Sequence, residues 1–180
     1  MKDLLFKKYT ETQICTKLVR NSSHYYSDSV SMYDKILKNG HNVDIREIKG
    51  NLKDIHDYLS YRVDLMVSEN LPLRDRIRDE YLWMEKTLKG YVFRFVEDTH
   101  ELKKIGRKLS MCVGSYDDKA YDGRCHIIVL EKDRKHIACI ELSSDFGAVY
   151  QVKGFDNNLL EGEPREATIE WMKAFRLSLN

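Results

Sequence analysis

The sequence predicts an α+β fold, in which an N-terminal helical part is followed by a small antiparallel β-sheet flanked by helices. Two observations support this class. Apolar runs rich in Ile, Val and Tyr, which are typical of strands, occur close together at residues 125–131, 136–142 and 148–155. Apolar residues at helical spacing dominate the chain before and after these runs. We therefore expect a helical part over residues 1–90 and an α+β part over residues 91–180, together in one compact unit.

The three apolar runs are expected to be the centre of the sheet. The connections between them, residues 132–135 and 143–147, are short, and short connections join antiparallel neighbours. Residues 91–96 alternate aromatic and mixed side chains and are expected to add a strand. The sheet should therefore contain three to four strands.

Helices are expected on both sides of the sheet in sequence. In the N-terminal part they cover residues 22–38, 51–67 and 73–88, with a short extended piece at 41–48. Asn39-Gly40 should end the first, Asn51 should cap the second and Gly90 should stop the third. Two more follow, one over residues 98–109 with a capping box of Asp98 and Glu101, and one from Pro164 onwards.

A Cys-Val-Gly-Ser-Tyr corner at residues 112–116 is the most unusual local feature. Gly114 is expected to adopt a backbone conformation that other residues avoid. Cys112 and Val113 are small and apolar, so the corner should enter the core.

This corner belongs to an ordered set of motifs: Leu109–Tyr116, Gly123, the strand His126–Leu130, Gln151–Gly154 and Asn157-Asn158. The set resembles the PcfJ-like family, whose members are carried by conjugative plasmids, integrative elements and phages. The resemblance covers about residues 91–175, and residues 52–59 more faintly. Met111 stands where the family usually has His, and Glu131 where it usually has a basic residue. Both differences argue against transferring a family activity to this chain.

Composition narrows the class of protein. The chain has 180 residues, 42% of them hydrophobic and 33% charged, with a net charge of +1. It contains neither an apolar run of roughly 18 residues nor a secretory signal pattern, so we expect no membrane contact and a location in the cytoplasm of a bacterial host. The four cysteines have no C-x-x-C spacing, and neither a metal site nor a cofactor is expected.

Candidate catalytic residues are few. Cys112 could act as a nucleophile near a base such as His100 or His126, but a buried structural thiol next to Val113 is the favoured explanation, because the sequence around it indicates no electropositive setting for a thiolate. His56-Asp57 could join the histidines in an acid–base set for RNA cleavage, or these could be ordinary surface and capping residues.

An acidic segment offers a second, different possibility. Asp117, Asp118 and Asp122 could bind a divalent cation through their oxygens, but a solvated loop that caps a short helix is the alternative.

Basic and aromatic residues provide candidate binding surfaces. The basic residues are Lys103, Lys104, Arg107 and Lys108 in the 98–109 helix, and Lys132, Arg134 and Lys135 in the first hairpin turn. Phosphate contact needs only such local charge, although an ordinary solvated face looks the same. The tyrosines of the helical part would suit a protein contact or the core; they are Tyr25, Tyr26, Tyr33, Tyr58, Tyr61 and Tyr81.

Two functions remain open. The resemblance to a mobile-element family, together with the short near-neutral chain, favours an interaction protein. Its partner would be an RNA-guided CRISPR effector nuclease of type II or the ribonucleoprotein that the nuclease forms with its guide RNA. The protein would then be an anti-CRISPR inhibitor, and whether it contacts the RNA directly stays open. The alternative is a PcfJ-like nucleic-acid-processing enzyme, a nuclease of a plasmid or phage. The enzyme question stays open and leans towards no.

Overall fold

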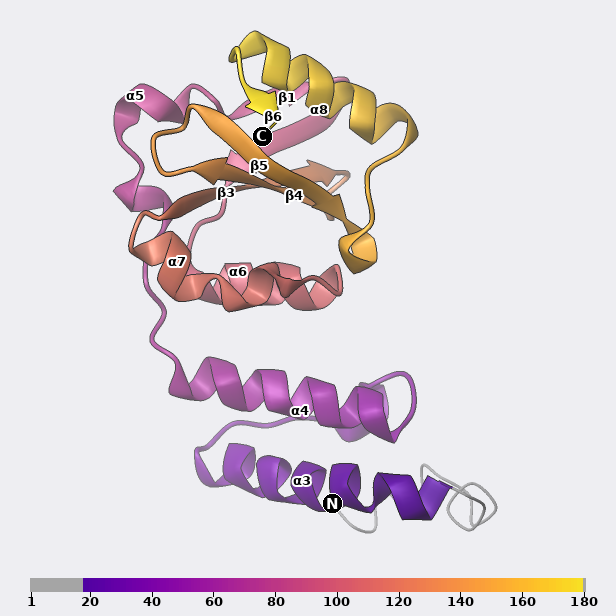
Figure 1. Cartoon of the computed structure of the whole chain (residues 1–180). Coiled ribbons are helices and arrows are strands. Elements are labelled where there is room, and N and C mark those ends of the chain that lie inside the picture. The colour runs from indigo at the N-terminus through magenta and orange to yellow at the C-terminus, as the bar shows by residue number, and fades with distance from the viewer. Residues whose placement is uncertain (1–17, 180) are drawn as a thin grey trace. The chain divides into compact units, whose positions relative to one another are not determined.

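The computed structural model describes residues 18–179, with side chains from Tyr25 onwards (Figure 1). The chain divides into two compact units between Glu69 and Asn70, before the boundary expected at residue 90. Within the described part of the chain, none of the helices combines the length and apolarity needed to cross a membrane.

The first unit is a pair of helices. They are α3 (Leu18–Lys38) and α4 (Leu52–Val67), joined by a segment with the short 3-10 helix η1 (Ile45–Glu47) where an extended piece was expected. Both predicted helices are confirmed, although α3 begins before its predicted cap. Asn51 caps α4 as predicted, because its side-chain oxygen accepts from the backbone N–H of Lys53 and Asp54.

The core of this pair lies between the two helices. Ile36 of α3 packs with Ile55 and Leu59 of α4, and all three are fully buried.

The second unit holds one sheet with helices on both faces. Its elements are η2 (Arg74–Arg76), α5 (Asp79–Leu82), β1 (Lys86–Leu88), β2 (Tyr91–Phe95), α6 (Thr99–Lys108), η3 (Cys112–Ser115), α7 (Asp117–Tyr121), β3 (Cys125–Lys132), β4 (Lys135–Ser143), β5 (Ala148–Gly154), η4 (Phe155–Asn157), α8 (Gly162–Ala174) and β6 (Ser178–Leu179). Neighbouring strands pair in the order β1 to β6, antiparallel except for the parallel pair β5 and β6. The α+β class is confirmed, but the described sheet has 6 strands instead of three to four.

The helix expected over residues 73–88 is wrong. Its place is taken by η2, α5 and β1, and β1 pairs with β2 around a two-residue turn. Lys89 and Gly90 both have positive φ, 51° and 78°, which is the backbone of a tight antiparallel hairpin. Gly90 therefore closes a hairpin instead of stopping a helix. Ile77 and Met84 are nevertheless buried, as the predicted helix required.

The two faces of the sheet are covered by different helices. Helix α8 lies on one face and helices α6 and α7 lie on the other (Figure 1). We name these the α8 face and the α6 face. Trp171 of α8 is fully buried on the first, stacked on Phe93 at 5.3 Å between ring centroids. On the second, Leu102 and Ile105 of α6 pack against Val129 of β3.

The corner at residues 112–116 differs from its prediction in two ways. Gly114 does not have a positive φ, so the argument from a special backbone conformation is wrong. Close packing explains the glycines better: a β-carbon on Gly106 of α6 would lie 2.5 Å from the Gly114 nitrogen. Val113 is buried as expected, whereas Cys112 is exposed and does not enter the core.

Candidate functional site

The motif residues from distant parts of the sequence meet at a small recess on the α6 face. The recess lies where the η3 corner meets β3, β4, β5 and η4. We name it the motif recess, and its lining residues are Met111, Cys112, Val113, Tyr116, Ile127, Cys139, Glu141, Gln151, Lys153 and Asn157. The corner and the Gln151–Asn157 segment, which are separate motifs in the sequence, therefore form one site.

Polar groups link the floor of this recess to its rim. Gln151 Nε2 donates to Glu141 Oε2 at 2.5 Å and to Tyr116 Oη at 3.2 Å. Glu141 is buried and also accepts a hydrogen bond from the Lys119 ammonium, which raises the pKa of Lys119. The Cys112 thiol lies 3.8 Å from Tyr116 Oη and 3.6 Å from Asn157 Oδ1.

Burial and hydrogen bonding shape the protonation of this cluster. Desolvation raises the pKa of Tyr116, so its hydroxyl keeps its proton at neutral pH. The buried Glu141 carboxylate is offset by the cation beside it, as a buried charge requires. The residues that line the recess thus carry amide, hydroxyl, thiol, carboxylate and ammonium groups, the last from Lys153.

The candidate catalytic residues are not brought together. Cys112 lines the recess, but no histidine is among the described residues that do so. His126 stacks on Phe146 at 3.9 Å and its Nε2 lies 3.2 Å from the Ser144 carbonyl oxygen, and burial lowers its pKa. His100 is at the start of α6, where its backbone N–H donates to Asn70 Oδ1.

The other candidate residues have local partners. His56 and Asp57 lie in the first unit and bind each other at 3.0 Å. Asp117 binds Lys103 at 2.8 Å, which holds the pKa of Asp117 below its usual value. Asp122 binds Arg124. Within the described residues, no group of His, Cys, Asp and Glu has the arrangement of a metal site.

The basic residues differ in how exposed their side chains are. The Lys103 side chain is only 10% exposed and pairs with Asp117, so it contributes little to the surface. Lys132 pairs with Glu163 at 3.1 Å. The remaining predicted binding residues are exposed: Lys104, Arg107 and Lys108 on α6, and Arg134 and Lys135 at the hairpin turn.

The predicted aromatic surface is less open. Tyr33 is buried, and Tyr25, Tyr26, Tyr58, Tyr61 and Tyr81 are all partly buried. The tyrosines of the described helical part therefore contribute more to packing than to an open surface.

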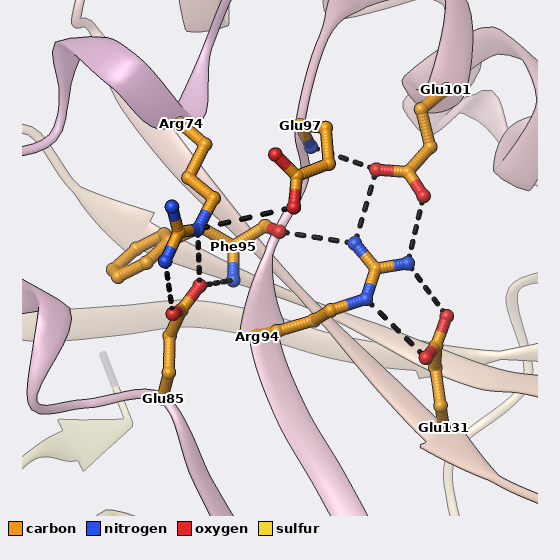
Figure 2. A network of polar contacts seen from close by, with 7 residues as sticks. All are labelled: Arg74, Glu85, Arg94, Phe95, Glu97, Glu101 and Glu131. Atoms are coloured by element: carbon orange, nitrogen blue, oxygen red, sulfur yellow. Dashed lines mark hydrogen bonds and ion pairs between the residues drawn. The ribbon is translucent and has the colours of Figure 1, made fainter.

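A second polar network on the α6 face was not foreseen from the sequence. Arg94 of β2 binds Glu101 of α6 and Glu131 of β3, each at 2.7 Å (Figure 2). The hydrogen bond to Glu101 is the main cause that raises the pKa of Arg94, and the bond to Glu131 adds to it. Burial alone would lower this pKa. The Glu131 carboxylate also lies 3.1 Å from Nε2 of His136.

The same network continues to the edge of the sheet. Arg74 binds Glu85 at 2.7 Å, and the Glu85 carboxylate accepts the backbone N–H of Phe95 at 3.0 Å (Figure 2). The hydrogen bond from Arg74 lowers the pKa of Glu85. Because side chains alternate along β2, Arg94 lies on the face opposite the buried Phe93 and Phe95. Its partners come from other elements: Glu101 from the helix that follows, and Glu131 from a strand 37 residues away in sequence.

The two positions that differ from the usual family pattern have separate places. Met111 lines the motif recess, so a thioether replaces the usual imidazole beside Cys112. Glu131 belongs to the Arg94 network and does not line the recess.

Comparisons with known proteins agree with the motifs. The family model described as PcfJ-like protein matches residues 25–168. No curated protein matches the chain, and no solved structure matches it. Since the matched residues make up most of the sequence and include the whole motif recess, the chain belongs to the PcfJ-like protein family.

Proposed function

We propose that this protein is a mobile-element interaction protein that inhibits an RNA-guided type II effector nuclease by binding its guide-RNA complex. The observation that supports this most is the set of exposed cations on α6 and the β3–β4 turn. Lys104 and Lys108 are one helical turn apart on α6, and Arg107 lies between them in sequence. A positively charged surface of this kind binds phosphates without reading sequence.

The charge of Lys108 reaches the neighbouring hairpin. Burial is the main cause that lowers the pKa of His136, and the charge of Lys108 is the next. His136 lies at the start of β4, directly after the exposed Arg134 and Lys135. Lys108 therefore acts at the start of β4, which follows the turn that carries Arg134 and Lys135.

A nuclease is the second candidate, and one observation favours it. The exposed Cys112 thiol lies in a recess with hydroxyl, amide and ammonium groups, as a nucleophile would. The position of His126 outside that recess weighs against it, because a nucleophile needs a base within hydrogen-bond reach.

An inhibition assay separates these two functions. The effector nuclease, loaded with guide RNA, is incubated with this protein and then given labelled target DNA. Inhibition by binding predicts loss of target cleavage, while labelled RNA and DNA stay intact with this protein alone, with or without magnesium. Turnover by this protein alone that disappears in Cys112→Ser would reject the binding proposal in favour of the nuclease.

A charge-reversal pair tests the surface. Lys104→Glu/Lys108→Glu should weaken binding to the guide-RNA complex and flatten its salt dependence, by roughly 0.7 in log–log slope for each lost phosphate contact. Arg165→Glu/Lys173→Glu makes the same charge change at exposed positions of α8, on the other face of the sheet, and should leave binding unchanged. Equal loss in both variants would contradict the proposed surface.

A further inference from the structure

The loop between β5 and α8 exposes two large apolar side chains. Phe155 is 62% exposed and Leu159 is 74% exposed. Single exposed apolar residues are common on proteins, so exposure alone assigns no role to them. What distinguishes this loop is how firmly its backbone is held.

Three backbone hydrogen bonds fix the loop. Gly154 N donates to Asn158 O at 2.9 Å, and Asn158 N donates to Phe155 O at 3.1 Å. Asp156 N donates to Leu109 O at 2.7 Å, which ties the loop to the end of α6.

The backbone of the loop also contains a left-handed turn. Asp156 and Asn157, two successive residues, have φ of 56° and 57°, a region that Asp and Asn adopt more readily than other residues except glycine. The loop therefore presents Phe155 in one defined place instead of letting it fold against the core.

Cations adjoin the backbone to which the loop is tied. The bond to Leu109 joins the loop to the residue that directly follows the exposed Arg107 and Lys108 in sequence. Asn157, whose amide oxygen is 3.6 Å from the Cys112 thiol, brings the loop to the rim of the motif recess, where Lys153 also lies.

The loop itself carries little negative charge. Asp156 is the acidic residue between Phe155 and Leu159, compared with the three cations Arg107, Lys108 and Lys153. Cations, an exposed aromatic ring and side-chain amides together have the chemistry of single-strand nucleic-acid binding.

We propose that the Phe155–Leu159 loop and the end of α6 bind an unpaired nucleotide of single-stranded nucleic acid. Its base stacks on Phe155, its flanking phosphates contact Arg107 and Lys108, and the Asn157 amide contacts the base edge. Unpaired bases are recognised in this way because only an unstacked base exposes its ring face. The inference rests on the proposed function in taking the strand from the guide RNA.

A protein partner is less consistent with these residues. A protein-docking patch has a continuous apolar centre with charged groups at its rim. The loop and the end of α6 instead carry cations and side-chain amides, which match phosphates and base edges.

Direct binding to oligonucleotides tests the inference without the effector nuclease. Fluorescence anisotropy at low salt is measured for one labelled sequence as single-stranded RNA, single-stranded DNA and duplex RNA, with 2-aminopurine in the unpaired strands. The protein should bind the single strands more tightly than the duplex and should quench the 2-aminopurine. A preference for RNA over DNA would identify contacts to the ribose, and equal affinity would identify base stacking alone; both results support the site.

Substitutions of Phe155 separate stacking from simple apolar contact. Phe155→Leu keeps an apolar side chain but removes the ring face, and should weaken single-strand binding about tenfold, whereas Phe155→Trp should preserve it. Tyr150→Ala, at another exposed aromatic of β5, is the control and should have no effect. Melting temperatures should stay the same, because Phe155 is largely exposed.

The outcomes also separate this inference from the proposed function. Wild-type affinity of Phe155→Leu, or equal binding of duplex and single strands, would overturn the nucleotide site. Absence of effector inhibition by a protein that still shows Phe155-dependent binding would instead reject the proposed inhibitor and leave the site standing. Loss of inhibition but not of single-strand binding in Phe155→Leu would indicate a protein contact and also overturn the inference.

Discussion

The two faces of the second unit's sheet are built on different principles. Beneath α8, the buried side chains are nearly all apolar, and Trp171, Phe93 and Phe95 are at the centre. Beneath α6, a smaller apolar core lies between two polar networks, one centred on Glu141 and the other on Arg94. These networks lie towards opposite ends of β4, since Glu141 is near its end and His136 is at its start.

The two faces are therefore expected to contribute differently to the stability of the fold. Apolar burial yields free energy in proportion to the area removed from water, whereas buried polar groups return little net stability even when fully paired. The α8 face is therefore expected to supply most of the stability. The α6 face instead has polar groups held at fixed positions by their hydrogen bonds and ion pairs.

The largest expected effect is on the α8 face. Trp171→Ala should lower the free energy of unfolding by about 3–5 kcal/mol, because it opens a cavity and leaves the Met84 carbonyl without its 2.8 Å hydrogen bond. Leu102→Ala on the α6 face should cost less. Urea denaturation of both variants measures this, and a larger loss in Leu102→Ala would break the comparison.

The next effect distinguishes two glycines on the α6 face. Gly106→Ala should cost about 1–3 kcal/mol, since its β-carbon would overlap the backbone of Gly114 and push α6 away from the corner. Gly114→Ala should cost clearly less, because its β-carbon would meet its nearest atoms at 3.5 Å, an ordinary contact. Thermal unfolding of the pair decides, and similar losses would show that the packing argument is wrong.

A smaller effect concerns pH and compares one histidine from each face. The pKa values of His126 and His136 are lowered from 6.5, mainly by burial. Below pH 6.5 the unfolded chain therefore binds protons that the folded chain does not. The stability that the two neutral histidines contribute above pH 6.5 is lost as the pH falls through their folded pKa values. The loss is about 1.4 kcal/mol for each unit of pKa difference.

The pKa of His136 also depends on the charged groups around its ring. Glu131 and Glu101 favour the protonated ring, while Lys108 and Arg94 oppose it. His136→Gln should make the pH dependence of unfolding below pH 6.5 shallower, as should His126→Gln on the α8 face. Denaturation at several pH values measures both, and an unchanged slope in the double variant would contradict the assignment.

The smallest effect on stability is expected for Cys112. Because its thiol is exposed, Cys112→Ser should change the free energy of unfolding by no more than about 0.5 kcal/mol. In a Cys15→Ser background, a thiol reagent should modify Cys112 in the folded protein and spare Cys125 and Cys139. Both spared thiols are buried, which raises their pKa values to about 11 and about 12. Mass spectrometry of the modified protein would show whether the thiols differ in this way.

Much of the architecture was readable from local patterns. The strands at residues 125–131, 136–142 and 148–155 and the Asn51 cap were predicted almost to the residue, since alternation, turn residues and capping act over a few neighbours. The helix predicted at 73–88 failed, because pairing with β2 outweighed a helical period that the local sequence also permits.

The sequence by itself determined the α+β class, the central strands and the motifs that mark the family. Only the tertiary structure decided which of those motifs meet. It brings Cys112 together with Gln151 and Asn157, removes Lys103 from the basic surface, and pairs Arg94 with Glu131. The reason is physical: helix caps and hairpins depend on adjacent residues, whereas these contacts form only once strands and helices distant in sequence have packed against one another.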